Sequence, residues 1–149
     1  MGKIKTAAHT CYYIRYHVVW VVKYRKNLLF RKEIDKTARR IFQEIAERYE
    51  FELEMYGTDG DHVHLFVGAA PRYSPARITQ IMKSVSAREI FKAHPEIRKE
   101  LWGGEFWGDG YYLGTVGHEV TESIVKGYIK NQGKETNHKK FECMQMSLF

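Results

Sequence analysis

The chain contains few residues that cross-link a fold or interrupt its secondary structure: only two of its 149 residues are cysteine and three are proline. Cys11 and Cys143 lie near opposite ends without a CxxC partner. A disulfide framework and a structural zinc site are therefore not expected, and two thiols in a reducing, cytoplasmic setting are the default. No apolar stretch approaches the roughly 20 residues that cross a bilayer, and none follows the charged residues of 1–5 as in a secretory signal. These absences argue against membrane-spanning and secreted classes.

Internal repeats, low-complexity tracts and Pro/Gly/Ser-rich linkers are also absent from the sequence. With 44% hydrophobic residues, the chain has enough apolar material for one core. We therefore expect a single domain over residues 1–133 and a C-terminal tail over residues 134–149. No glycine-rich phosphate-binding loop is present, so we expect no nucleotide cofactor.

Positive charge and aromatic residues are what the chain has in excess. Its formal charge is +6, its pI is about 9.3, and 14% of its residues are aromatic. Basic groups interleaved with rings suit single-stranded nucleic acid, because phosphates pair with cations and bases stack on rings. A solvated basic surface without a particular partner is the alternative. The candidate DNA-binding residues are Lys23, Tyr24, Arg25, Lys26, Arg39, Arg40 and Lys83.

Hydrophobic periodicity predicts the order β-α-β-β-α-β followed by a last helix. Strands are expected over 12–23, 51–58 and 62–68, with a hairpin turn at Asp59-Gly60 between the last two. Helices are expected over 31–50, from Ser74 to residue 91 or 94, and from 119 to 131 or 132. Residues 105–116 are expected to form an irregular strand or hairpin. Within 51–58, alternation places Phe51, Leu53 and Met55 opposite Glu52, Glu54 and Tyr56.

This order predicts an α+β, ferredoxin-like or RRM-like fold, with two helices on one face of an antiparallel sheet. The other face of the sheet would be open. In RNA-recognition modules of this shape, that face binds single strands.

Two histidines stand out in the segment Asp61-His62-Val63-His64-Leu65-Phe66. On a strand, His62 and His64 share one face while Val63 and Leu65 take the other. Two imidazoles on a rigid strand can chelate a metal ion. The alternative is two polar residues on the solvent face of a half-exposed strand.

The last predicted helix carries Tyr128 and Gln132, which are four residues apart and therefore lie on one helical face. A glutamine oxygen with two imidazoles would give a divalent ion three protein ligands and leave positions open for a phosphate oxygen. Tyrosine is an uncommon but known nucleophile. Alone, Tyr128 is more readily explained as a packing or surface residue than as a nucleophile, since the chain has ten tyrosines. Gly127 before it either lets this segment move or packs close to a neighbour.

Together, His-hydrophobe-His on a strand and Tyr-x-x-x-Gln in a C-terminal helix resemble the HUH single-tyrosine transposases of bacterial and archaeal insertion sequences, the TnpA type. The opening strand, Tyr16-His17-Val18-Val19-Trp20 and onward to Lys26, is also similar to theirs. The resemblance covers about residues 12–133. Tyr-x-x-x-Gln in this order and spacing makes it far more specific than the His-x-His motif alone.

The resemblance implies that His62, His64 and Gln132 hold Mg2+ or Mn2+ and that Tyr128 attacks a DNA phosphodiester, leaving a 5′-phosphotyrosine and a 3′-hydroxyl. It implies a substrate of single-stranded DNA with imperfect hairpins at insertion-sequence ends, and a cytoplasmic homodimer with active sites shared between subunits. Asp61 would orient a histidine or lie near the metal, although the turn at 59–61 explains an aspartate by itself.

Three other functions use the same residues differently. A non-catalytic RRM-like binder of single-stranded or hairpin nucleic acid would use the basic and aromatic residues and give Tyr128 no chemical role. A structural zinc protein would need cysteines with zinc-site spacing, which Cys11 and Cys143 lack. A metal-dependent phosphoesterase would use water at the same histidines without a covalent intermediate.

Overall fold

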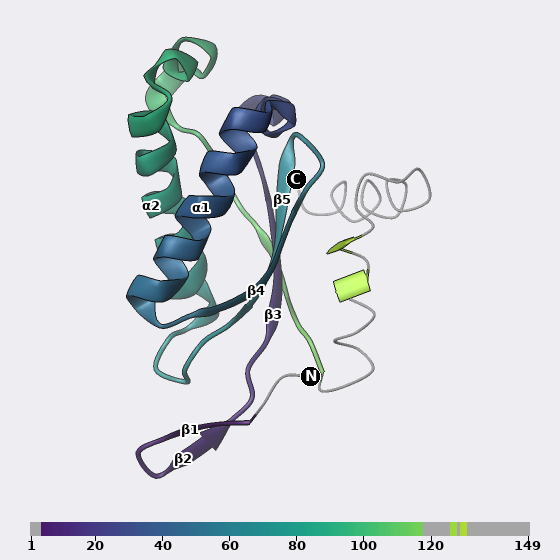
Figure 1. Cartoon of the computed structure of the whole chain (residues 1–149), viewed down its shortest axis with the longest axis vertical. Coiled ribbons are helices and arrows are strands. Elements are labelled where there is room, and N and C mark those ends of the chain that lie inside the picture. The colour runs from purple at the N-terminus through teal and green to yellow at the C-terminus, as the bar shows by residue number, and fades with distance from the viewer. Residues whose placement is uncertain (1–3, 118–125, 128, 131–149) are drawn as a thin grey trace.

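The computed structural model of the protein describes residues 4–117, 126, 127, 129 and 130. Its centre is a four-stranded antiparallel sheet in the order β4-β5-β3-β6, and two helices cover one face of this sheet (Figure 1). The order of elements along the chain confirms the predicted ferredoxin-like arrangement. The elements are β3 (Tyr16–Val21), α1 (Lys32–Tyr49), β4 (Glu52–Thr58), β5 (His62–Gly68), α2 (Pro75–Ala93) and β6 (Tyr112–Thr115).

The hydrophobic core lies between the sheet and the two helices. Alternate residues of β3 and β5 point into it, among them Trp20 and Leu65, both fully buried. The apolar face of α1 meets them, and the buried residues of this helix are Ile34, Ala38, Ile41, Phe42, Ile45 and Ala46. Each isoleucine or phenylalanine side chain contributes on the order of 1.5–3 kcal/mol on burial.

Local sequence signals set the ends of α2 and of the β4–β5 turn. The Ser74 hydroxyl accepts a hydrogen bond from Arg77 N at 3.1 Å, so Ser74 is the N-cap of α2 and Pro75 is its first residue. Gly60 adopts a φ of +84° between β4 and β5. Both features confirm the predictions made at these positions.

A β-bulge in β4 overturns the predicted alternation of this strand. The register with β5 shifts between Leu53 and Met55, so Leu53 packs on the core beneath α1 and α2, whereas Met55 lies on the opposite face of the sheet. Tyr56 then returns to the core beside Phe42. The prediction that Leu53 and Met55 share a face was wrong, because the extra residue of the bulge reverses the side-chain direction.

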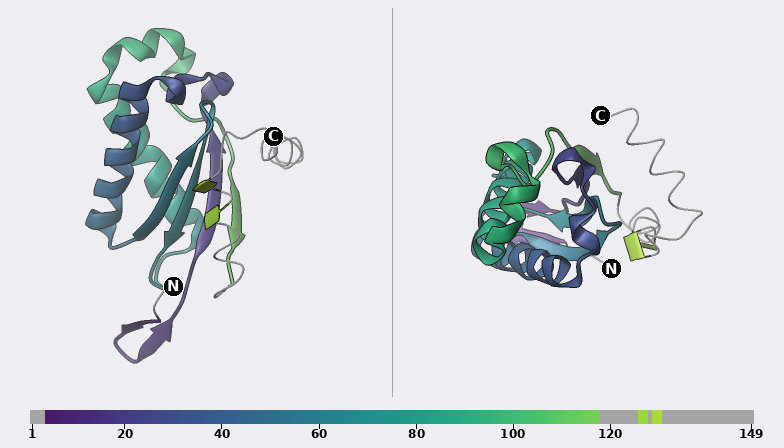
Figure 2. Two further views of the ribbon diagram at one scale, coloured as in Figure 1. Left: turned by 45° about the vertical axis from the view of Figure 1, so that its right-hand side comes forward. Right: turned by 90° about the horizontal axis from the view of Figure 1, so that it is seen from above.

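The first predicted strand is shorter than expected and is preceded by a hairpin. β3 ends at Val21, and residues 12–23 are not one strand. Strands β1 (Lys5–Ala7) and β2 (Thr10–Tyr12) pair antiparallel with each other and project beyond the end of the sheet (Figures 1 and 2). Most of the residues of this hairpin are exposed.

The sheet face opposite α1 and α2 is buried at its centre, so the prediction of an open face was wrong. Val19, His62 and Phe66 lie on this face, and each is at most 2% exposed. Ile129 packs against Phe66, Met55 and Val116. Apolar contacts from the C-terminal part of the chain therefore occupy a surface that RRM-like proteins leave to nucleic acid.

No helix within residues 4–117 has the length and apolar character needed to span a membrane.

Two glycines with positive φ offer a matched test of the β4–β5 turn. A Cβ at Gly60 would overlap the Phe30 ring, whereas a Cβ at Gly103, φ +82°, would meet nothing within 4 Å. We expect Gly103→Ala to lower the free energy of unfolding by about 1–2 kcal/mol through backbone strain alone. Gly60→Ala should cost roughly 1 kcal/mol more, because it also displaces the ring.

Urea unfolding of both variants, alone and with Phe30→Ala, checks this expectation. The extra cost of Gly60→Ala should disappear when Phe30 is truncated. Equal losses at the two glycines would show that the Phe30 contact has no role in the turn.

Candidate functional site

The histidine pair lies at the buried centre of the sheet. His62 and His64 share the face of β5 opposite the helices, as predicted, and are 2% and 0% exposed. Their ring centroids are 5.1 Å apart, with the ring planes at 69°. The alternative of two polar residues on a solvent face is therefore wrong.

A third histidine, His17 of β3, holds His64. His17 Nε2 lies 2.8 Å from His64 Nδ1, and the two rings stack with centroids 5.1 Å apart. His17 is 8% exposed, and Tyr112 of β6 contacts its ring edge-on. The antiparallel register places His17 opposite Phe66 and Val19 opposite His64, so the two histidines are diagonal neighbours on one face. Sequence reasoning did not assign His17 to the site.

Asp61 holds His62 in a similar way. Asp61 Oδ1 lies 2.6 Å from His62 Nδ1, and Asp61 Oδ2 accepts a hydrogen bond from Arg25 Nε at 3.1 Å. Val22 N also donates to the Asp61 carbonyl oxygen, which ties the turn before β5 to the end of β3. A carboxylate bonded to one imidazole nitrogen fixes the tautomer and the orientation of the ring.

Burial keeps two of the imidazoles, those of His17 and His64, neutral. Burial lowers the pKa of His17 to about 4, and burial together with the neighbouring histidines lowers the pKa of His64 well below its ordinary value. Burial alone would raise the pKa of Asp61, but its interactions with His62 and Arg25 outweigh this and lower it. The neutral imidazole is the state that binds a metal ion.

The donor set fits a metal ion through one nitrogen of each histidine. Nδ1 of His62 and Nδ1 of His64 are engaged by Asp61 and His17, so a metal ion at these rings would be coordinated through Nε2 of each. Within the described part of the chain, no three His, Cys, Asp or Glu residues form a metal-binding group. The predicted third ligand, Gln132, and the predicted nucleophile, Tyr128, lie outside the described residues.

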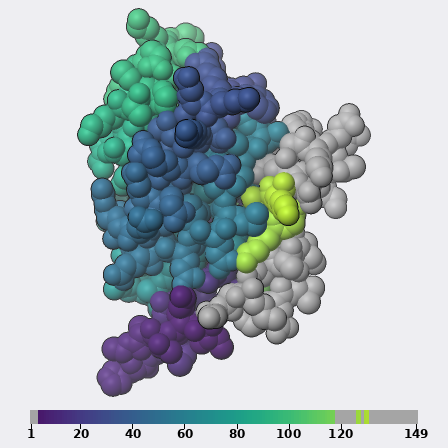
Figure 3. All heavy atoms as spheres, viewed as in Figure 1, coloured from purple at the N-terminus to yellow at the C-terminus, as the bar shows by residue number. Residues whose placement is uncertain are grey.

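The residues on either side of Tyr128 in the chain are seated on the sheet. Residues 126, 127, 129 and 130 are helical, and they lie beside the edge strand β4 in the space-filling view (Figure 3). Ile129 is 2% exposed and packs on Phe66, which is on the same face and the same strand as both histidines. Lys126 Nζ lies 5.2 Å from the centre of the Phe66 ring.

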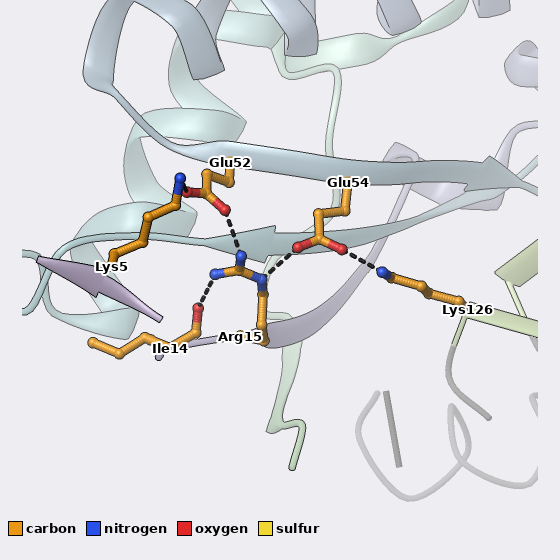
Figure 4. A network of polar contacts seen from close by, with 6 residues as sticks. All are labelled: Lys5, Ile14, Arg15, Glu52, Glu54 and Lys126. Atoms are coloured by element: carbon orange, nitrogen blue, oxygen red, sulfur yellow. Dashed lines mark hydrogen bonds and ion pairs between the residues drawn. The ribbon is translucent and has the colours of Figure 1, made fainter. Parts of the chain in front are cut away.

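A buried arginine links this segment to the sheet. Arg15 donates to Glu52 and, at 2.6 Å, to Glu54, and Glu54 pairs in turn with Lys126 at 2.5 Å (Figure 4). Lys5 of β1 pairs with Glu52 at 2.8 Å. Sequence reasoning missed Arg15, which is only 3% exposed. Its burial is tolerated because two carboxylates and the Ile14 carbonyl oxygen accept its hydrogen bonds.

The candidate DNA-binding residues fall into different surroundings. Lys83 donates to the carbonyl oxygens of Gly108 and Gly110 at 2.7 and 2.9 Å, so it ties α2 to the loop before β6. Arg39 lies over the Tyr56 ring and Arg40 pairs with Glu44, both on the side of the sheet away from the histidines. Lys23, Tyr24, Arg25 and Lys26 lie together at the end of β3, beside Asp61.

Comparison with known proteins identifies the family. Residues 10–132 match the family described as "Transposase IS200 like". The chain belongs to this family of transposases. Its matched region contains His62, His64, Tyr128 and Gln132 and agrees with the extent expected from the sequence motifs.

Two relatives illustrate the similarity to insertion-sequence transposases. The ISDra2 transposase TnpA of Deinococcus radiodurans is 34% identical over 121 residues, which are 81% of this chain and 85% of that protein. The transposase for insertion sequence element IS200 of Salmonella typhimurium is 27% identical over 135 residues, 91% of this chain and 87% of that protein.

Solved structures share the fold. A protein of Deinococcus radiodurans R1 that was assigned as a transposase superposes with a TM-score of 0.66 at 32% identity, over 89% of this chain and 98% of its own. A REP-associated tyrosine transposase bound to a REP hairpin has a TM-score of 0.57 at 12% identity, over 91% and 77% of the two chains, which supports the fold alone.

The buried histidines predict a pH dependence of stability in the metal-free protein. Because the folded pKa of His17 is about 4 and its unfolded value about 6.5, its contribution is present above pH 6.5 and is lost as the pH falls toward 4. Between pH 7 and pH 5 this group should lower the free energy of unfolding by about 2 kcal/mol.

Urea unfolding at both pH values, with a chelator present, tests this expectation. His17→Asn should show a smaller loss between pH 7 and pH 5 than the wild type, whereas substitution of the exposed His9 by Asn should leave the loss unchanged. The same loss in His17→Asn and wild type would contradict the assignment of His17 as a buried neutral imidazole.

Proposed function

We propose that this transposase cleaves and rejoins single-stranded DNA at insertion-sequence ends, with Tyr128 as nucleophile and a divalent metal at His62 and His64. The observation that carries the proposal is the buried histidine pair, each ring held at Nδ1 by another side chain. These two polar rings lie at the centre of a sheet, on the face against which Ile129 packs, and their burial costs free energy. A role in metal binding accounts for their position.

His62, His64 and Gln132 would hold Mg2+ or Mn2+, the first two through Nε2. Such an ion withdraws electron density from a phosphate oxygen and neutralises charge that develops during displacement. The role of this chain's own residues is to hold the two imidazoles in fixed orientation, through His17 and Asp61.

In the proposed step, the Tyr128 oxygen forms a bond to the phosphorus while the bond from phosphorus to the 3′-oxygen breaks. The phenol loses its proton and the departing 3′-oxygen gains one, which gives a 5′-phosphotyrosine and a 3′-hydroxyl. The number of phosphoester bonds does not change, so rejoining requires no nucleotide cofactor. Positioning and charge neutralisation would supply most of the rate enhancement.

Hairpins near the element ends are the proposed recognition sites. The net charge of +6 favours a DNA partner, and the REP-associated relative is bound to a hairpin. One nucleophilic tyrosine per chain attaches one strand per site, so processing of two element ends requires two chains. We therefore propose a homodimer that works in the cytoplasm, with active sites shared between subunits.

A covalent assay tests the proposal. Wild-type protein incubated with labelled single-stranded hairpin DNA from the flanks of its own gene, with Mg2+ or Mn2+, should give a protein–DNA band on a denaturing gel. Tyr128→Phe, His64→Ala or a chelator should each abolish the band. Substitution of the exposed Tyr111 by Phe provides a matched control that should retain it.

The rival functions give different results in the same assay. A non-catalytic RRM-like binder would retain the DNA on a native gel without any covalent band. A phosphoesterase that uses water would cleave the DNA without attachment. Either outcome would overturn the assignment of Tyr128 as nucleophile.

Metal affinity tests the support of His64 by His17. Loss of a partner behind a ligating histidine typically weakens metal binding by about 10- to 100-fold. We expect His17→Ala to weaken Mn2+ binding by this factor in a titration that follows the electron paramagnetic resonance signal of the unbound ion. His94→Ala, which removes a histidine bonded to Thr37 on the helical side, should have no effect. Unchanged affinity in His17→Ala would contradict this role.

A further inference from the structure

The turn after β3 has an unusual backbone. Tyr24 and Arg25 have φ values of 58° and 52°, in the left-handed region that non-glycine residues rarely adopt. The surrounding segment holds them there: Val22 N donates to Asp61 O and Lys23 N donates to Phe106 O, both at 2.8 Å. Strained residues that are fixed in this way cluster at functional sites.

This turn presents the Tyr24 ring to solvent beside an exposed tryptophan. The Tyr24 hydroxyl donates to the Trp102 carbonyl oxygen at 3.1 Å, and the two ring centroids are 5.8 Å apart. Trp102 is 77% exposed and Tyr24 is 52% exposed. Exposure of two large rings in contact, from segments far apart in sequence, is unfavourable in water unless a ligand covers them. We name this pair the Tyr24–Trp102 platform.

The charges around the platform favour a polyanion. Lys26 and Arg98 are exposed, and Arg98 Nη1 lies beside the position of Gly104, two residues after Trp102. Neither cation has an ion pair among the residues that the structure describes. Two carboxylates of the same segments have cationic partners, because Arg31 pairs with Glu100 and Lys23 with Glu105.

The platform is connected to the histidine pair by a short chain of contacts. Arg25, next to Tyr24, donates from Nε to Asp61, and the other oxygen of Asp61 is bonded to Nδ1 of His62. A DNA strand that places one phosphate at the histidines would therefore lie close to the turn at 23–26.

We propose that the Tyr24–Trp102 platform binds an unpaired nucleobase of single-stranded DNA next to the scissile phosphate. This inference rests on the proposed function, because it takes the single strand at the histidine site as the ligand. The base stacks on the exposed indole, and Lys26 and Arg98 neutralise its flanking phosphates. Since every base has a π-face, the platform positions the strand without selecting its sequence.

Tryptophan fluorescence offers a direct test. The other tryptophans, Trp20 and Trp107, are 0% and 5% exposed, so a ligand that stacks on an exposed ring can quench only Trp102. Oligodeoxythymidylate of about ten nucleotides, a length typical of single-strand sites, should quench the emission on binding. An abasic strand of the same length, which has the phosphates without the bases, should bind more weakly and quench little.

Three variants separate stacking from other effects. Trp102→Ala should weaken binding of the oligodeoxythymidylate by about 5- to 100-fold, the range expected for loss of one stacked base. Trp102→Phe should recover most of the affinity, because a flat ring remains. Tyr111→Ser, which removes an exposed ring outside the platform, should change the affinity less than twofold.

The outcomes distinguish this inference from the proposed function. Equal binding and quenching by the abasic strand, unchanged affinity in Trp102→Ala, or no binding of either strand would overturn the platform. If Tyr128 forms covalent DNA while Trp102→Ala binds normally, only the platform is wrong. If the base-dependent quenching occurs and no covalent DNA forms, the platform is supported and the assignment of Tyr128 as nucleophile is wrong.

Discussion

The hydrogen bond between His17 and His64 is the contact on which the rest of the site depends. It spans 2.8 Å between two imidazoles that are almost without solvent contact, and it exists only because β3 and β5 pair in the register that makes these residues diagonal neighbours. An imidazole buried without a partner would destabilise the sheet by roughly 1–3 kcal/mol. Paired in this way, His64 is held rigid and neutral, and its second nitrogen is directed away from His17.

The two faces of the sheet have different roles, one in stability and the other in the proposed chemistry. One face packs on α1 and α2 and contains most of the apolar core, while the other contains His17, His62 and His64 with Phe66. Because side chains alternate along β5, a shift of one residue in its register would exchange the two sets. Ile129 and the Arg15–Glu54–Lys126 network seat the chain around Tyr128 on the histidine face, so the fold itself brings the C-terminal segment to the site.

Features that depend on a few neighbouring residues could be predicted from the sequence. The apolar period of α1, the Ser74 N-cap and the turn at Gly60 are of this kind, and the shared face of His62 and His64 follows from strand geometry alone. The order of these elements was sufficient for the fold class.

Features that depend on pairing between distant segments could not be predicted. The bulge after Leu53 is defined only by its partner strand β5, and the contact of His17 with His64 joins residues 47 positions apart. The early end of β3 reflects the left-handed conformation of Tyr24 and Arg25, which neither residue type signals. A histidine inside the apolar run 16–22 was the one available hint of His17. The positions of Tyr128 and Gln132, outside the described residues, stay predictions.

The central claim is that His17 and Asp61 fix both histidines of β5 in the tautomer that a metal ligand needs. Long-range proton–nitrogen correlation spectra of the metal-free protein, labelled with 15N-histidine at pH 8, test this claim most directly. We predict that His17 Nε2 accepts from His64 Nδ1 and that Asp61 accepts from His62 Nδ1, so both residues carry hydrogen on Nδ1 and none on Nε2. A hydrogen on Nε2 of either residue would contradict it, since that nitrogen could not then coordinate an ion.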